Sequence, residues 1–279
     1  MRLGIAGGIS HSSAEEWAEK QVKLGCAAVV FPVGYQSADH VIDAYHKACT
    51  DHGLIIAEVG AWCNPLSADP EERKKNVEYI KNQLRLADRV GARCCVDIAG
   101  TSGERWDGAY IDNYSEDMYK RIIETVQEII DSAEPSNTFY SLETMPWMIP
   151  DSPEIYAKII KDVGRDRFAA HLDVANLINS PERYFFNGAL MEKCFDLLGG
   201  KIRSCHAKDV LLEAPMTLHL KETACGNGGL DIAEYAALAD KSDRDMPFII
   251  EHLATEDEYV NSVNYIKNLL KDTNILITL

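Results

Sequence analysis

Four polar residues follow apolar runs at regular places in the second half of the chain. They are Glu143, Asp173, His206 and Glu251. A carboxylate buried at the end of an apolar strand is costly unless it is neutralised, and three carboxylates in one place would repel one another. A divalent cation removes this repulsion, and three carboxylates with one imidazole suit Mn²⁺, Co²⁺ or Zn²⁺. The sequence therefore predicts that these four residues share one metal ion.

A separate structural role for each residue is the alternative. Glu143 would then cap a helix, Asp173 would form a loop, His206 would be a satisfied core histidine and Glu251 would pair with a cation. Such independent roles would not require equivalent places on four successive strands, so the shared site is the preferred interpretation.

The elements that must position these residues alternate along the whole chain. Eight short apolar runs predict strands, and each is followed by a segment of helical periodicity. The predicted strands are Arg2–Ala6, Ala27–Pro32, Leu54–Trp62, Arg93–Ala99, Thr138–Thr144, Phe168–Val174, Ile202–Ala207 and Pro247–His252. Eight β-then-α units favour a closed (β/α)8 TIM barrel, whose reactive groups lie at the carboxyl ends of the strands. An open doubly wound sheet is the alternative, although no Gly-x-Gly-x-x-Gly follows the first strand.

The predicted helices carry boundary signals. Asp69-Pro70 and Ser152-Pro153 precede acidic residues in the way that helix N-termini prefer. Glycines stand just before several predicted strands, where a helix would end with a residue that tolerates positive φ. These are Gly25, Gly53, Gly91, Gly164 and the pair Gly199-Gly200. No linker or charge block interrupts the series, so residues 1–279 are expected to form one α/β barrel domain.

Composition limits the partners. The chain has 279 residues, 46% of them hydrophobic and 26% charged, with a net charge of −16. Nucleic acid and anionic membranes would be repelled, so we expect a neutral or weakly charged small-molecule substrate, no nucleic-acid partner and no membrane partner. The absence of a signal-like start predicts a cytoplasmic location, and the eight cysteines are expected to be reduced and mostly buried. Self-association into a homo-oligomer is compatible with the sequence.

Two motifs resemble a known superfamily. The segment His206-Ala207-Lys208-Asp209 resembles the His-x-Lys-Asp segment of xylose isomerase-like barrels, and Gly226–Asp231 is similar to the glycine-rich stretch that opens their seventh helix. The superfamily includes sugar isomerases, ketose epimerases, hydroxypyruvate isomerases, inosose dehydratases and endonuclease IV. The resemblance covers essentially the whole chain. It implies one divalent metal ion on the four residues, with Mn²⁺ the first expectation and Co²⁺, Zn²⁺ or Mg²⁺ the alternatives.

The same resemblance implies that Glu143 and Glu251 act as the acid–base pair, one on each face of the substrate. Two departures set this chain apart from ketose epimerases, which place a histidine where Asn176 stands and an arginine where Leu212 stands. Endonuclease IV needs additional histidines for three zinc ions, and Asn176 removes one of them. With the acidic charge, this departure makes DNA repair the disfavoured branch.

Three further residues are candidates for binding substrate. Trp147 and Trp62 follow strand ends and could form apolar walls for a sugar ring, although buried core aromatics are the equally weighted alternative. Lys208 lies two positions after a proposed ligand and could bind a substrate oxygen. A surface ion pair between Lys208 and Asp209 is the alternative.

Other polar residues receive structural interpretations. Glu58 and Asp97 lie within predicted strands and are interpreted as barrel-filling polar residues or ion-pair partners. His171 alternates with Asp173 on one strand, and a structural role is preferred over a ligand role. His252 and His219 show no convincing spacing for chemistry.

Three functional hypotheses follow. The first is a metal-dependent isomerase or epimerase that transfers a proton next to the carbonyl of a small sugar or keto-sugar, through an enediolate that the metal stabilises. The second is a metal-dependent lyase or dehydratase, acting on a keto-sugar or inosose at the same site. The third is a barrel without catalytic activity that serves as a subunit of a complex. The sequence does not identify the substrate.

Overall fold

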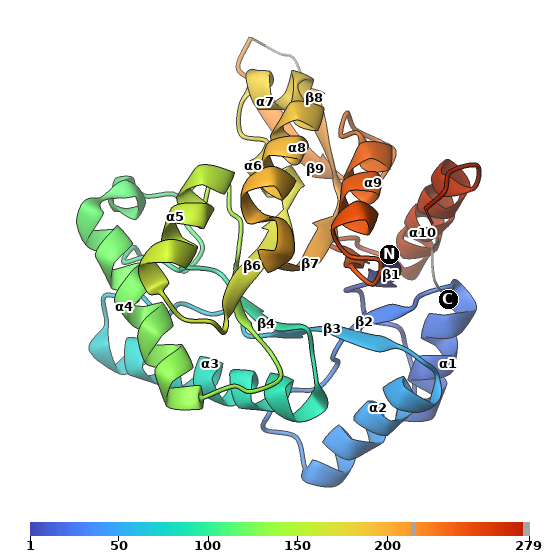
Figure 1. Cartoon of the computed structure of the whole chain (residues 1–279), viewed down its shortest axis with the longest axis horizontal. Coiled ribbons are helices and arrows are strands. Elements are labelled where there is room, and N and C mark those ends of the chain that lie inside the picture. Colours follow the sequence, from blue (N-terminus) through green and yellow to red (C-terminus); the bar gives the residue numbers. More distant parts are fainter. Residues whose placement is uncertain (214–215, 276–279) are drawn as a thin grey trace.

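The barrel closes as predicted. The computed structural model describes residues 1–213 and 216–275, and within these ranges eight parallel strands form one closed barrel (Figure 1). In sequence order they are β1 (Arg2–Ile5), β2 (Ala28–Val30), β3 (Ile55–Gly60), β4 (Cys94–Asp97), β5 (Tyr140–Glu143), β6 (Phe168–Asp173), β7 (Ile202–Ala207) and β10 (Pro247–Ile250). The first strand pairs with the last, Leu3 opposite Phe248, so the open-sheet alternative is wrong.

The longer helices follow these strands and surround the barrel (Figure 1). They are α1 (Ala14–Leu24), α2 (Asp39–Asp51), α3 (Pro70–Val90), α4 (Glu116–Ala133), α5 (Pro153–Val163), α8 (Asn187–Leu198), α9 (Ile232–Ser242) and α10 (Glu256–Leu270). The predicted apolar face of α3 is buried, with Ile80 and Leu84 fully enclosed. Apolar residues at helical spacing thus bind each helix to the sheet.

The boundary signals also act as expected. Asp69 and Ser152 accept hydrogen bonds from backbone N–H groups of the first turns of α3 and α5. Gly25 and Gly91 end α1 and α3 in the left-handed conformation, at φ of 91° and 67°. These caps fix where each helix turns back toward the next strand.

The cysteines lie inside this packing. All eight are free thiols, and Cys63 alone is more than slightly accessible. Across residues 1–213 and 216–275, none of the helices combines the length and the apolar character that crossing a membrane requires.

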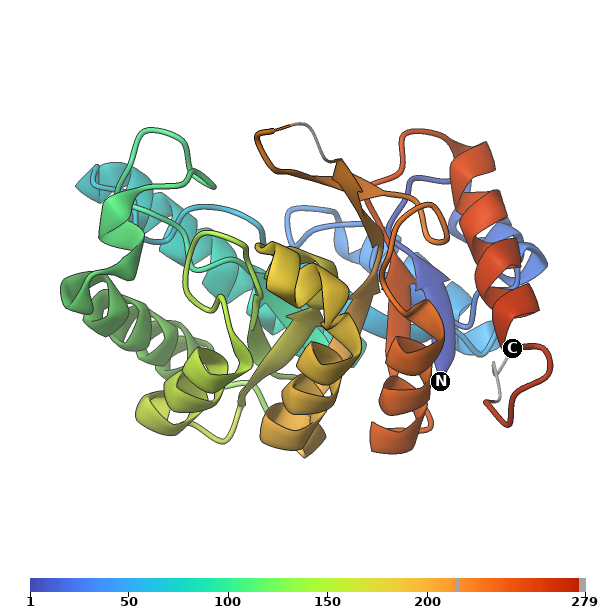
Figure 2. The same ribbon diagram turned by 90° about the horizontal axis from the view of Figure 1, so that it is seen from above.

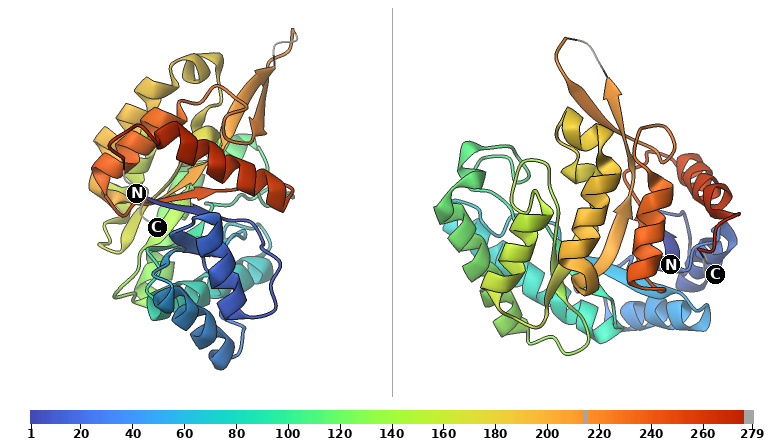
Figure 3. Two further views of the ribbon diagram at one scale, coloured as in Figure 1. Left: turned by 90° about the vertical axis from the view of Figure 1, so that its right-hand side faces the viewer. Right: turned by 45° about the horizontal axis from the view of Figure 1, so that its top comes forward.

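Additional elements lie at the carboxyl ends of the strands. The largest is an antiparallel hairpin, β8 (Asp209–Glu213) and β9 (His219–Thr223), which follows β7 directly and stands above the barrel (Figures 2 and 3). Short helices occupy other connections after strands, namely η1 (Ile111–Tyr114), α6 (Val174–Leu177) and α7 (Pro181–Phe185), whereas η2 (Gly199–Lys201) lies between α8 and the start of β7. The strand pattern predicted the barrel but not this hairpin.

Candidate metal centre

The four predicted ligands meet at the carboxyl end of the barrel. Glu143 ends β5, Asp173 ends β6 opposite His206 on β7, and Glu251 follows β10. Each of the four offers an oxygen or nitrogen, and these atoms all lie within 4.8 Å of one another. Nδ1 of His206 is 3.3 Å from Glu143 Oε1 and 2.9 Å from Glu251 Oε2. The four side chains therefore form one buried cluster rather than four separate structural features.

Lys208 closes the cluster from the side of the hairpin. Its ammonium lies 2.8 Å from Asp173 Oδ2, 2.7 Å from Glu251 Oε1 and 3.0 Å from Glu222 Oε2. Only 2% of the side chain is exposed, so the alternative of a surface ion pair with Asp209 is wrong. Lys208 thus supplies positive charge directly beside the carboxylates.

Asp209 has a different task. Its carboxylate accepts hydrogen bonds from the backbone N–H groups of Gly226, Gly228 and Leu230. At Gly228 a Cβ atom would lie 2.2 Å from the carbonyl oxygen of Val210, so only glycine allows this approach. The last residue of the His-x-Lys-Asp segment therefore anchors the glycine-rich loop ahead of α9.

The charges in the cluster are not balanced by protein groups alone. Burial, reinforced by the nearby carboxylates of Glu251 and Glu143, raises the pKa of Asp173 to about 7 even though Lys208 opposes this shift. Burial alone would lower the pKa of His206, but the carboxylates around it hold that pKa well above its ordinary value. Burial alone would raise the pKa values of Glu143 and Glu251, but chiefly the charge of His206 lowers both below their ordinary value. Asp173 and His206 thus retain protons beside two ionised carboxylates, and such a site is suited to a cation of higher charge.

This donor set fits the predicted metal. The cluster offers three carboxylate oxygens, which are hard ligands, and one imidazole nitrogen, which is a borderline ligand. Such a set suits Mn²⁺, Co²⁺, Zn²⁺ or Mg²⁺. A divalent ion would take the place of the protons that Asp173 and His206 otherwise hold.

A second buried group supports His206 from below. Nε2 of His206 lies 3.2 Å from Glu58 Oε2, and Glu58 Oε1 is 3.0 Å from Nε2 of His171. Ser204 donates its hydroxyl to the same Glu58 oxygen. With its Nε2 proton held by Glu58, His206 can present Nδ1 to a metal. The interpretation of Glu58 as an ion-pairing residue of the barrel is thus confirmed. The structural role of His171 stays a prediction, because ligand atoms of Glu58, His171 and His206 also lie close enough together to hold a metal ion.

Asp97 was interpreted in the same way. It is fully buried at the end of β4, where its Oδ1 accepts hydrogen bonds from the backbone N–H groups of Cys63 and Ile98. Its side chain therefore fills the barrel, as expected, and it also orders the loop after β3.

Above the cluster lies a cavity of about 520 Å³ whose wall includes Glu143 and Glu251. Trp62 and Trp147 both line it and are 36% and 38% exposed, so the alternative of buried core aromatics is wrong for both. The Trp62 ring packs against Gly60. A Cβ atom at position 60 would lie only 2.1 Å from an indole carbon of Trp62, so this position requires glycine.

Trp147 is held by the loop after β4. Its indole N–H donates a hydrogen bond of 2.7 Å to the carbonyl oxygen of Asp107, and Asn113 donates to the Trp147 carbonyl. Arg105 and Trp106, from the same loop, complete this side of the cavity. Three indole rings and one guanidinium thus line the cavity above the carboxylate cluster.

Three residues of the mouth were not among the predicted site residues, namely Asn176, Glu222 and His252. Asn176 donates a hydrogen bond to Glu143 Oε1 at 3.3 Å, and Glu222 lies between Lys208 and Nδ1 of His252. His252 has a φ of 57°, which turns the chain sharply after Glu251. Adjacency of His252 to a proposed ligand was an available signal, whereas Glu222 belongs to the unpredicted hairpin and had none.

The fold and the cluster together define a (β/α)8 barrel with its polar site at the carboxyl ends of the strands, where barrel enzymes place their active sites. A family model described as xylose isomerase-like TIM barrel matches residues 18–269, so the chain belongs to this family.

Known proteins that resemble this chain fall into more than one functional class. A curated relative, a probable endonuclease 4 of Persephonella marina (strain DSM 14350 / EX-H1), is 22% identical over 228 residues, covering 78% of this chain and 76% of the relative. The crystal structure of a D-tagatose 3-epimerase-like protein superposes with a TM-score of 0.72 and 21% identity, covering 98% of each chain. A xylose isomerase-like TIM barrel protein from Mycobacterium smegmatis, in complex with magnesium, gives a TM-score of 0.67 and 18% identity, covering 95% and 91% of the two chains. At these identities the structural likeness establishes the fold alone.

Proposed function

We propose that this protein is a divalent-metal-dependent isomerase or epimerase that moves a proton next to the carbonyl of a small sugar or keto-sugar. The observation that carries the proposal is the position of Glu143 and Glu251, which belong both to the four-residue cluster and to the wall of the tryptophan-lined cavity. Flat indole faces suit the apolar face of a sugar ring, and the carboxylates lie where its polar groups would enter.

The metal would be held by Glu143, Asp173, His206 and Glu251. When bound, it would polarise the substrate carbonyl and stabilise the negative charge of an enediolate. Glu143 ends β5 and Glu251 follows β10, so the two carboxylates come from different parts of the barrel rim, and one would accept a proton from carbon while the other returns it. The ammonium of Lys208 is positioned to bind a substrate oxygen at the edge of the cluster.

The surrounding groups hold these carboxylates in place. Trp62 donates its indole N–H to Glu143 Oε2 at 2.9 Å, and Asn176 donates to the other oxygen of the same carboxylate. Glu251 is held by Lys208 on one oxygen and by His206 on the other. Carboxylates fixed in this way need little reorganisation before proton transfer.

A metal-dependent lyase or dehydratase acting on a keto-sugar or inosose is the alternative at the same site, since elimination uses the same enolate. Asn176 and Leu212 stand where ketose epimerases are expected to carry a histidine and an arginine. Asn176 contacts Glu143 directly, so the departure lies beside a proton carrier and favours a reaction that differs from standard epimerisation.

An endonuclease of the endonuclease IV type is a second candidate, favoured by the likeness to the probable endonuclease 4. The net charge of −16 opposes binding to a polyanionic duplex. Cleavage of a duplex with one abasic site, assayed with Zn²⁺, distinguishes this candidate. We expect no cleavage above that of a Glu143→Gln variant.

The decisive experiment is incubation of the Mn²⁺-loaded protein with a panel of ketoses, aldoses and keto-sugars in D2O, followed by NMR after removal of protein and metal. Deuterium at the carbon beside the carbonyl is the expected result. A new unsaturated product would instead assign the lyase reaction, and an unchanged panel would count against both.

A further inference from the structure

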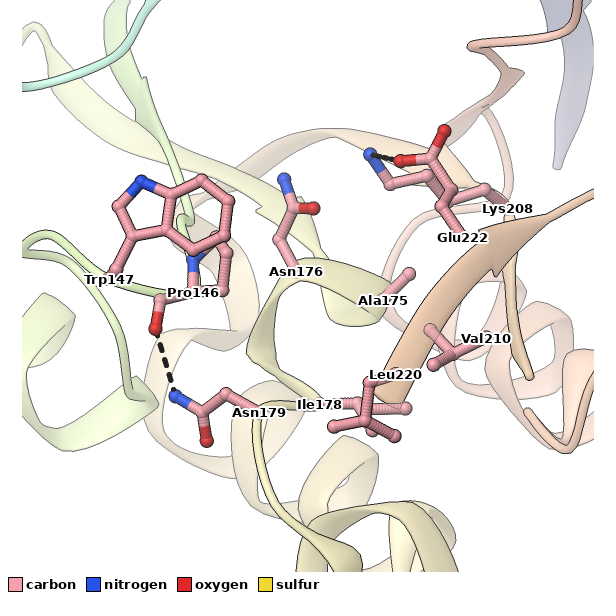
Figure 4. Close-up of a pocket in the computed structure, with 10 residues that line it drawn as sticks. All are labelled: Pro146, Trp147, Ala175, Asn176, Ile178, Asn179, Lys208, Val210, Leu220 and Glu222. Carbon is pink, nitrogen blue, oxygen red and sulfur yellow. Dashed lines mark hydrogen bonds and ion pairs between the residues drawn. The ribbon is translucent and has the colours of Figure 1, made fainter. Parts of the chain in front are cut away.

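A second cavity adjoins the tryptophan-lined one. Its volume is about 430 Å³, and it lies between the segment after β5, helix α6 and the hairpin (Figure 4). The two cavities share Pro146, Trp147, Asn176 and Glu222, so they meet side by side at the mouth of the barrel. The metal cluster lies at this junction, because Glu143 and Glu251 line the first cavity and Lys208 lines the second.

The second cavity has a different chemical character from the first. Its far wall is formed by Ile178, Val210 and Leu220, and Figure 4 shows Val210 and Leu220 across the space from Pro146 and Trp147. Asn176, Lys208 and Glu222 lie on the border next to the metal cluster. Asn179 lies on the other side, where its amide N–H donates to the carbonyl oxygen of Pro146 (Figure 4). An apolar groove therefore leads away from a polar centre.

The hairpin explains how this wall is formed. Leu212 pairs with Leu220, and Val210 pairs with Glu222. Alternation along the two strands places these four side chains on one face. Val210 is only 4% exposed, although it belongs to a two-stranded sheet that stands above the barrel. The hairpin thus presents an apolar face to the groove, with one acidic group nearest the metal cluster.

We infer that the substrate has two parts, a sugar ring and an apolar substituent, rather than being a free monosaccharide. The ring occupies the tryptophan-lined cavity over the carboxylates, and the substituent occupies the groove walled by Ile178, Val210 and Leu220. This inference rests on the proposed function, because it takes the tryptophan-lined cavity as the sugar site. A free ketose would leave the groove filled with water against apolar side chains, which contributes no binding energy.

Calorimetric titration tests the inference without requiring turnover. The Mg²⁺-loaded protein is titrated with methyl and phenyl D-glucopyranosides, each as the α and the β anomer. The phenyl glycoside of at least one anomer is expected to bind about tenfold more tightly than its methyl counterpart, because the phenyl ring buries apolar surface in the groove. Two outcomes would overturn the inference. One is equal affinity for the methyl and phenyl glycosides of both anomers, and the other is that none of the four glycosides binds.

Two variants locate the effect. Leu220 is only half-buried, so Leu220→Ser should fold, and we expect it to abolish most of the preference for phenyl. Leu220→Trp should abolish it by filling the groove. Leu218→Ser is the matched control, because Leu218 is 48% exposed just before β9 and lies outside both cavity walls. A phenyl preference that survives both Leu220 variants would place binding elsewhere and overturn the inference.

The titration tests the two-part substrate independently of the deuterium-exchange experiment, which tests the proposed reaction. Deuterium exchange on free ketoses without any phenyl preference would remove only the inference of a two-part substrate. A phenyl preference that depends on Leu220, without exchange or elimination on any sugar, would leave the groove assignment standing and remove the proposed reaction.

Discussion

The indole N–H of Trp62 donates a hydrogen bond of 2.9 Å to Oε2 of Glu143, joining residues that are 81 positions apart. The bond fixes the carboxylate that we propose as a proton carrier, and it places the indole ring at the cavity wall. Trp62→Phe keeps an aromatic wall but removes the donor. We expect kcat of the exchange reaction to fall by roughly tenfold, since hydrogen bonds to charged groups contribute about 1.5–3 kcal/mol.

Trp106→Phe is the control for Trp62→Phe, because Trp106 lines the same cavity outside the carboxylate cluster. Its effect should fall on KM rather than on kcat. Equal losses of kcat in both variants would show that the Trp62 bond has no special part in proton transfer.

The two proposed proton carriers give the sharpest test of the site. Glu143→Gln and Glu251→Gln should each lower turnover by about 10²–10⁴-fold, the usual contribution of general acid–base catalysis. Circular dichroism should remain that of the parent protein. Glu213→Gln, on the exposed side of the hairpin, should behave as the parent. Near-normal turnover in either cluster variant would remove that residue from the proton-transfer role.

Lys208 balances charge in the metal-free protein. Lys208→Met should lower the free energy of unfolding by about 3 kcal/mol without metal, because it leaves buried carboxylates without their cationic partner. Added Mn²⁺ should recover most of this loss. The measurement is urea unfolding in EDTA and in Mn²⁺. The control is Lys81→Met, a largely buried lysine paired with Glu78 and Glu128 away from the cluster, whose loss should not depend on metal.

Glu58 orients His206 and should therefore influence metal affinity without touching the metal. We expect Glu58→Gln to weaken Mn²⁺ binding by about 10–100-fold, the usual effect of removing such a partner. Asp97→Asn is equally buried on the neighbouring strand and should change this affinity little. Metal content measured by elemental analysis after dialysis compares the two. Stoichiometric metal in the parent protein would also count against a barrel without catalytic activity.

The carboxylate of Asp88 is expected to make the stability of the protein depend on pH. Burial alone would raise the pKa of Asp88, but the backbone N–H groups of Asn137 and Thr138 and the Ser136 hydroxyl hold it below its ordinary value of 3.8. Because the pKa of Asp88 is lower in the folded protein than in the unfolded chain, its carboxylate stabilises the folded state above pH 3.8. This stabilisation is lost as the pH falls through the lowered pKa of the folded protein.

Asp88→Asn should therefore lower the free energy of unfolding by about 1 kcal/mol at pH 7, with a smaller loss near pH 3. Urea titrations at the two pH values measure the difference. A loss that is the same at both would contradict the assigned role of the carboxylate.

Local pattern was sufficient for much of the fold. The spacing of apolar residues and the turn-forming residues between them predicted each barrel strand. The helix caps Asp69 and Gly91 lie where the boundary signals predicted them. Such features depend on residues a few positions apart, so they can be inferred without tertiary information. The convergence of Glu143, Asp173, His206 and Glu251 was also predictable, because closing a parallel barrel brings the carboxyl ends of its strands to one rim.

What the sequence determined by itself is therefore the barrel and the identity of the groups at its rim. The tertiary structure alone decided which charges those groups meet: Lys208 turned inward to Asp173 rather than outward to Asp209, and Glu58 joined to His206 across the barrel. It also decided that the hairpin with Leu220 and Glu222 would wall a second cavity. These contacts join residues that are far apart in the chain, and such pairings depend on how the closed barrel brings distant loops together in space.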